Sequence, residues 1–195
     1  MPITINGTGS ITGLTAGGLP DGSITSADLA SGAITAGALP AGSILQVVQT
    51  EKTDVSSSVT GSTWADFGLS VNITPSSTSS KVLILCKLQV SNGNGYDVKQ
   101  RLMRNSTPIF IGDAAGSRPQ ATSTYLANYD TGYSSLPVSI SYLDSPSTTS
   151  QVTYKVQGAN YTSGTVWLNR GPNDSNTATY ESRTASSIIV MEVAG

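Results

Sequence analysis

The sequence predicts an all-β protein in which an N-terminal repeat region precedes a β-sandwich. Three observations lead to this prediction. After residue 45, short apolar segments alternate with turn residues; no segment shows helical periodicity; and before residue 45, aliphatic residues recur at every fifth position. We expect residues 1–13 to form a terminal segment, residues 14–44 a repeat-built stalk and residues 45–195 a knob.

The composition of the chain changes near residue 45. Before it, the only charged residues are Asp21 and Asp28, and there is no aromatic residue. After it lie both Trp, both Phe, all eight Tyr and the other 20 charged residues. Residues 1–44 lack the large side chains that a separate core needs, so we do not expect them to fold alone.

The N-terminal region contains an unbroken series of aliphatic residues spaced five apart. Between Thr12 and Ser43 there is no other Ile, Leu, Val, Met or aromatic residue. A ten-residue repeat is superimposed, because Gly22–Leu29 is matched by Gly32–Leu39. The members of this aliphatic series are Leu14, Leu19, Ile24, Leu29, Ile34, Leu39 and Ile44.

A spacing of five suits neither a regular helix nor a flat strand. On a helix the series would wind around all faces, and on a strand it would alternate between the two faces. The chain must therefore turn within each repeat. A single-chain pentapeptide β-helix would have fewer than the roughly three coils that a stable array needs, which favours a stalk of several intertwined chains. A disordered linker is the third alternative, and the strict spacing weighs against it.

The region after residue 45 predicts a β-sandwich or jelly roll. Residues 82–90 begin apolar on both faces and then alternate, which is typical of a central strand. Arg101 and Arg104 are three apart on one predicted strand and should face opposite sides, with one of them free to pair with a carboxylate. The expected strands are residues 43–49, 67–73, 82–90, 98–104, 109–111, 138–142, 152–156, 166–168 and 187–193.

The residue counts exclude several classes of function. The net charge is −2 and there is no histidine, so nucleic-acid binding and histidine-based catalysis or metal binding are not expected. Cys86 is the single cysteine, and we expect it to be a buried apolar residue. No apolar run reaches the length of a membrane span, and the first ten residues do not resemble a signal peptide.

A search for catalytic residues finds no motif. A glycan-cleaving enzyme would need paired carboxylates, and a Ser–Lys pair stays possible without a supporting pattern. Turns favour acidic residues in any case, because Asp accepts bonds from local backbone donors. We therefore expect a non-enzymatic protein without cofactor or metal. The acidic residues in predicted turns are Asp113, Asp130, Asp144, Asp174 and Glu181.

Aromatic residues are the better candidates for recognition. Tyr125, Tyr129 and Tyr133 are four apart, and Asn128 lies among them. Tyrosine and asparagine suit carbohydrate or protein surfaces, because they offer flat apolar area with a polar edge. The alternative is a strand whose tyrosines point inward.

Several segments together resemble the fibre proteins of tailed bacteriophages, in particular those predicted in phages of marine bacteria and cyanobacteria. The similarity covers nearly the whole chain. The segments that carry it are Ile3–Gly13, the ten-residue repeats, Gly112–Arg118, Tyr142–Pro146 and Arg183–Gly195.

The resemblance implies a homotrimeric virion fibre. The N-terminal segment, with Ile3, Ile5 and Ile11, would anchor the chain to a capsid or tail protein of the particle. The repeats would form a trimeric stalk, and the knob would be similar to tumour-necrosis-factor-like jelly rolls and would contact a host glycan or protein. The chain is shorter than long tail fibres, so a head fibre or a capsid-decorating cement protein fits as well.

Overall fold

The computed structural model describes residues 4–5, 11–12, 24–56, 59–60, 62–92, 97–126, 135–160, 164–179 and 181–195. The chain divides into two compact units, residues 1–39 and residues 40–195. Ile44, expected as the last residue of the repeat region, is the first residue of a strand in the second unit.

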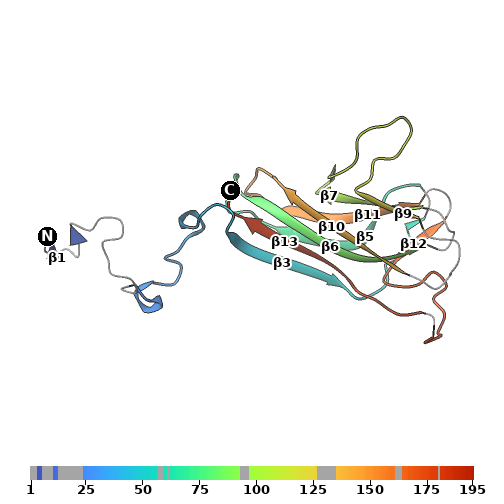
Figure 1. Cartoon of the computed structure of the whole chain (residues 1–195), viewed down its shortest axis with the longest axis horizontal. Coiled ribbons are helices and arrows are strands. Elements are labelled where there is room, and N and C mark those ends of the chain that lie inside the picture. Colours follow the sequence, from blue (N-terminus) through green and yellow to red (C-terminus); the bar gives the residue numbers. More distant parts are fainter. Residues whose placement is uncertain are drawn as a thin grey trace. The chain divides into compact units, whose positions relative to one another are not determined.

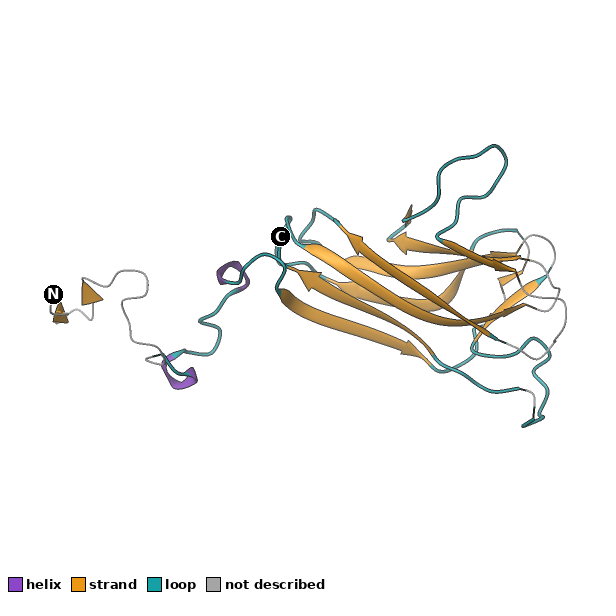
Figure 2. Cartoon of the chain, viewed as in Figure 1, coloured by secondary structure: helices purple, strands orange, loops and turns teal. Residues whose placement is uncertain are grey.

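The second unit is built from antiparallel strands, which confirms the all-β prediction (Figures 1 and 2). Each predicted strand is present within a few residues of its expected bounds. The short strands β4 and β9 were not among them. The strands are β3 (Ile44–Lys52), β4 (Val59–Thr60), β5 (Ala65–Ile73), β6 (Lys81–Asn92), β7 (Asp97–Arg104), β8 (Thr107–Ile109), β9 (Ser123–Leu126), β10 (Leu136–Asp144), β11 (Val152–Asn160), β12 (Thr165–Leu168) and β13 (Ser186–Val193).

The strands form two sheets that pack as a sandwich. In the six-stranded sheet, β6 is central: β10 pairs along one edge, while β13 and β12 share the other edge. β3 lies beyond β13, and β4 lies beyond β12. The five-stranded sheet has the order β5-β11-β7, and β8 and β9 pair with different parts of the outer edge of β7.

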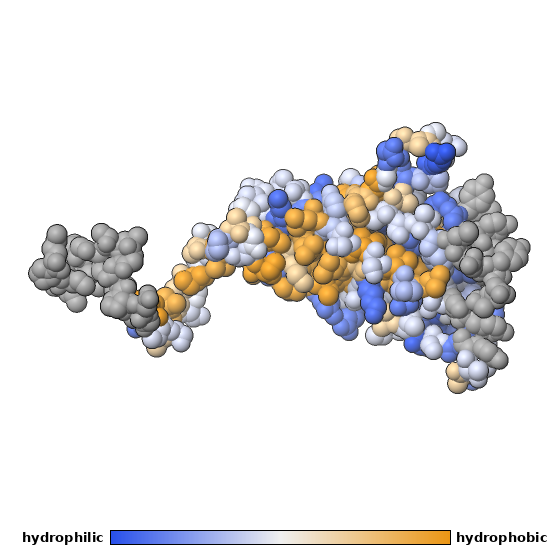
Figure 3. All heavy atoms as spheres, in the orientation of Figure 1, coloured by the Kyte–Doolittle hydropathy of each residue, from blue (hydrophilic) through white to orange (hydrophobic). Residues whose placement is uncertain are grey.

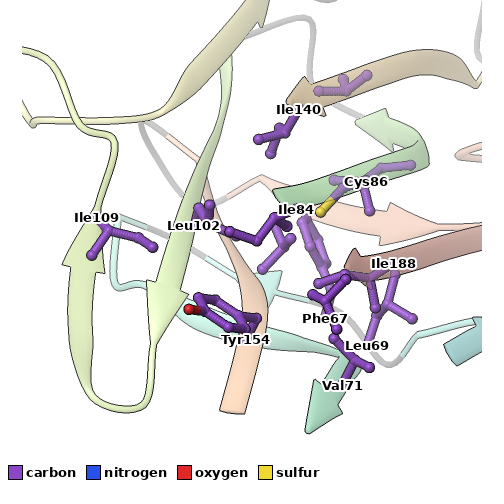
Figure 4. Packing of buried hydrophobic residues seen from close by; sticks show 14 of the residues in the cluster. Phe67, Leu69, Val71, Ile84, Cys86, Leu102, Ile109, Ile140, Tyr154 and Ile188 are labelled. Carbon is purple, nitrogen blue, oxygen red and sulfur yellow. The ribbon is translucent and has the colours of Figure 1, made fainter. Parts of the chain in front are cut away.

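The core lies between the two sheets, because apolar residues alternate with polar ones along most strands. On β5, Phe67, Leu69, Val71 and Ile73 are all buried, and the residues between them are exposed. Figure 4 shows Phe67, Leu69 and Val71 beside side chains of the opposite sheet, such as Ile84 and Ile188. Complete burial of one such side chain stabilises a fold by about 1.5–3 kcal/mol.

Gly158 lets Phe67 pack across the sheet that carries it. A β-carbon on Gly158 would lie 2.3 Å from the Phe67 ring, so a side chain cannot fit there without moving the ring. The register of β11 against β5 shifts beside this position, between Lys155 and Gln157. This glycine is therefore required by close packing rather than by a turn.

Among the described residues, two carboxylates are buried in the sandwich, and both accept hydrogen bonds. Asp144 on β10 accepts bonds from Arg104 at 3.0 Å and from the Tyr154 hydroxyl at 2.7 Å, and this joins the two sheets. Arg104 thus pairs with a carboxylate, while Arg101 faces the other side of β7. At the other site, Glu192 is 1% exposed and accepts bonds from the Ser76 backbone N–H at 2.7 Å and from the Gln46 amide at 2.5 Å.

The described part of the repeat region repeats a backbone conformation every ten residues. Two 3₁₀ turns, η1 (Ser26–Asp28) and η2 (Ala36–Ala38), lie ten residues apart. Beyond each turn comes a glycine with positive φ, +79° at Gly32 and +88° at Gly42. The chain thus turns within each repeat, as the spacing of five requires. Further upstream, Thr4–Ile5 (β1) pairs with Ile11–Thr12 (β2).

We predict that Gly158→Ala destabilises the sandwich by about 1–3 kcal/mol, because the new methyl group displaces the Phe67 ring. The loss should appear as a lower midpoint in urea unfolding. Gly112→Ala is the matched control, since its β-carbon meets only the Ala121 carbonyl oxygen at 4.0 Å. Equal midpoints for the two variants would contradict this account of Gly158.

We predict that Glu192 makes the stability of the sandwich depend on pH. Burial alone would raise the pKa of Glu192, but hydrogen bonds from Ser76 and Gln46 outweigh it, and the net pKa is lowered. The carboxylate therefore stabilises the fold above the ordinary glutamate pKa of about 4.3, and this contribution is lost as the pH falls through the lowered value.

Glu192→Gln should therefore cost about 1–3 kcal/mol at pH 7, because an amide group would face the donors of Ser76 and Gln46. The difference from the unchanged protein should shrink as the pH falls from about 5 to 3. Urea unfolding at several pH values measures it, with Glu51→Gln, an exposed glutamate on β3, as the control. A difference that stays constant with pH would contradict the assignment.

Candidate functional site: an exposed apolar sheet face

The outer face of the six-stranded sheet carries a row of apolar residues across four strands. Val47, Met191, Leu83 and Leu143 lie directly opposite one another on β3, β13, β6 and β10. Val47 is 57% exposed and Leu143 is 45% exposed. Residues that pair in this way point to the same face of a sheet, so the row is continuous.

A second row extends this surface. Ile189 pairs with Leu85 on the same face, and both are partly exposed. Figure 3 shows apolar side chains gathered over the part of the sandwich where β3, β13 and β6 run. We call this surface the apolar face and define it by Val47, Leu83, Leu85, Leu143, Ile189 and Met191.

The outer face of the five-stranded sheet is polar instead. Asp66, Gln157 and Arg101 lie opposite one another on β5, β11 and β7. Lys155 forms an ion pair with Asp66 at 2.8 Å, and Thr153 bonds to Asn72 at 2.7 Å. The two outer faces of one sandwich therefore differ in the way expected when water covers one of them and protein covers the other.

The aliphatic series leads along the chain into the apolar face. Its last member, Ile44, pairs with Val193 at the end of β13 and is 48% exposed. The four preceding members are exposed as well: Ile24 (54%), Leu29 (43%), Ile34 (55%) and Leu39 (38%). Every side chain described in residues 24–35 and 37–39 is exposed, so these four aliphatic side chains have no core within the described part of the chain.

Several predicted site residues lie outside the described part of the chain. These are Ile3, Leu14, Leu19, Asn128, Tyr129 and Tyr133. For Ile5 and Ile11, the structure describes only the backbone, in which the two residues pair across β1 and β2.

Tyr125, the described member of the tyrosine group, packs against the core from β9. Its hydroxyl lies 3.5 Å from the Val90 carbonyl oxygen. Burial raises the pKa of Tyr125 to about 12. The ring therefore takes the inward position that the sequence left open as the alternative to recognition.

Two of the candidate acidic residues line one hollow, of about 370 Å³, in the loop between β12 and β13. Asp174 pairs with Arg170 at 3.2 Å and with Arg183 at 2.5 Å. Glu181 accepts bonds from the backbone N–H groups of Asp174 and Ser175. Both carboxylates are thus engaged in holding the loop together.

Cys86, the single cysteine, has a position in the core rather than in a site. Cys86 is buried on β6, and this burial raises the pKa of its thiol to about 12, which makes it a poor nucleophile. Among the described residues, no cluster of acidic or cysteine side chains has the composition of a metal site. No helix in the described part of the chain is long and apolar enough to cross a membrane.

Comparison with known proteins gives no further assignment. No protein-family model matches the chain, and no curated protein is similar to it in sequence.

The apolar face was not predicted from the sequence, although its signal is present. Residues 82–85 and 188–191 are apolar at consecutive positions, which was interpreted as the pattern of central strands with both faces covered. The apolar pattern alone does not say what covers the outer face of the sheet. The structure shows that nothing in the described chain covers it.

Proposed function

We propose that the protein is a non-enzymatic structural protein that assembles as a homotrimer through its apolar face and its aliphatic series. The observation that carries the proposal is the exposed apolar row of Val47, Met191, Leu83 and Leu143, on a sandwich whose other outer face is polar. Exposed apolar area of this kind marks an interface between protein surfaces.

A second copy of the chain is the occupant we assign to the apolar face. Ile44 pairs with Val193, two residues after Met191 on β13, and it is also the last member of the aliphatic series, so the series ends beside the apolar face. Seven aliphatic residues spaced five apart in each chain would supply one side chain at each level of a shared axis. Each Ile or Leu buried there would stabilise the assembly by about 1.5–3 kcal/mol.

The strand order supports a jelly roll as the architecture of the knob. Each connection between successive long strands joins the two sheets: β3 to β5, β5 to β6, β6 to β7, β7 to β10, β10 to β11 and β11 to β13. Such crossing, with β3, β13, β6 and β10 in one sheet and β5, β11, β7 and β8 in the other, supports the proposal of a two-sheet jelly roll.

A virion fibre is the biological setting that agrees with these features. The resemblance of several segments to phage fibre proteins supplies this setting, with the N-terminal segment attached to the particle and the knob facing outward. Three equal knob surfaces would then bind a host glycan or protein with avidity, although each contact is weak.

A capsid-decorating protein without receptor binding is the second candidate, since an exposed apolar face could also rest on a shell. A glycan-degrading spike is less favoured. Asp174 and Glu181 share a hollow as such an enzyme requires, but both are bonded to donors of their own loop.

We predict that Val47→Glu weakens the trimer at least about 100-fold, because each copy would bury an unpaired carboxylate in the interface. Val47 is 57% exposed, so the monomer should fold normally. Sedimentation velocity over a dilution series measures the equilibrium. Ser70→Glu, on an edge strand of the polar sheet, is the control, and dissociation at the same concentration for both variants would contradict the proposal.

We predict that the double variant Ile24→Asp/Ile34→Asp dissociates at a higher concentration than the unchanged protein, because two levels of the shared axis become charged. Light scattering during dilution measures this. Ser31→Asp/Ala41→Asp adds the same charge at exposed turn positions outside the series and should behave normally. Identical dissociation of the two double variants would show that the aliphatic series is not part of the interface.

A further inference from the structure

Arg101, on the polar outer face of the five-stranded sheet, is held in a fixed orientation by its neighbours. Arg101 projects from β7, and its guanidinium carbon lies 4.5 Å from the centre of the Trp64 ring. Its Nε donates to the Gln157 side-chain oxygen at 2.8 Å. Stacking and hydrogen bonding therefore fix the orientation of the guanidinium before any ligand binds.

Arg101 differs from the other buried or partly buried cations described in the knob. Among the described residues, the buried Lys99 and the partly buried Lys52, Arg104, Lys155 and Arg170 each form an ion pair with a carboxylate. Arg101 is partly buried as well, but no carboxylate lies within ion-pair distance of it in this part of the chain. Burial lowers the pKa of Arg101, although nearby Asp66 partly offsets this.

The groups around Arg101 form an ordered row of hydrogen-bonding side chains. Gln157 donates to Asp66 at 2.7 Å, and Lys155 donates to the other oxygen of Asp66 at 2.8 Å. Because Asp66, Gln157 and Arg101 lie in register on three neighbouring strands, the row spans two interstrand spacings, about 10 Å. This is roughly the length of a disaccharide.

We propose that Trp64, Arg101, Gln157 and Asp66 form a binding site for a carboxylate-bearing sugar on the outer face of the five-stranded sheet. The free edge of the Arg101 guanidinium binds the sugar carboxylate through two parallel hydrogen bonds. Trp64 provides apolar area with a polar edge, and Gln157, Asp66 and Lys155 exchange hydrogen bonds with the sugar hydroxyls. An acidic peptide offers the carboxylate but not the row of hydroxyls.

This inference rests on the recognition role in the proposed function, and it identifies the surface and the ligand class. If the apolar face is covered by other copies, the polar face with Arg101 is directed away from them. A trimer then presents three such sites, so millimolar affinity for one sugar gives much tighter binding to a polymer.

The test measures binding of the full chain to immobilised polygalacturonate, a uronate polymer, with dextran as the neutral polymer and polyglutamate as the acidic peptide. We expect binding to polygalacturonate alone. Arg101→Lys keeps the charge but loses the bidentate geometry and should weaken binding at least about tenfold. Arg118→Lys, at an exposed arginine of the loop after β8, is the matched control and should bind normally.

Three results would overturn the site: no binding to polygalacturonate, equal binding to dextran or polyglutamate, or equal losses in Arg101→Lys and Arg118→Lys. The mass of each variant in solution separates this proposal from the assembly proposal. A trimer that does not bind the polymer contradicts only the sugar site. A monomer that binds it through Arg101 contradicts only the assembly.

Discussion

The exposed apolar residues on the outer face of the six-stranded sheet are the feature of this structure on which the proposed assembly depends. Four strands bring Val47, Met191, Leu83 and Leu143 into one row, and the inner sides of the same strands already contribute Val190 and Ile84 to the core. A sheet that is apolar on both sides needs protein on both sides. The five-stranded sheet needs protein only on its inner side, because Asp66, Lys155 and Arg101 make its outer side polar.

The sequence predicted most of the strands, because their signals are local. Alternation along residues 67–73 predicts a strand, and turn residues such as Asn105 predict a hairpin, without knowledge of the fold. The pairing of the sheets, the Asp144 bonds to Arg104 and Tyr154, and the fit of Phe67 over Gly158 depend on contacts between distant segments, which no local pattern records. Tyr125 is a further example. The spacing of the tyrosines along the sequence is the same whether their rings pack into the core or bind a ligand.

The sequence predicted the aliphatic series of the proposed interface but not the apolar face. The spacing from Leu14 to Ile44 favours an axis shared by several chains over a single-chain β-helix, which would have too few coils, and this axis stays a prediction. The apolar face was not predicted, because continuous apolar segments are also typical of strands that are buried on both faces. Ile44 belongs to the aliphatic series, as its last member, and it pairs with Val193 on β13 beside the apolar face. Low charge before residue 45 agrees with an axis that has no room for desolvated ions.

The mass of the unmodified chain in solution tests the central claim most directly. The chain has a mass of 20.0 kDa, so native mass spectrometry of the full-length protein should give a trimer of three times that value, about 60 kDa. Hydrogen exchange on the same sample should show protection of β13, the strand that carries Met191 and Ile189. A monomer of 20.0 kDa at micromolar concentration would contradict the account, because the apolar face would then remain exposed to water.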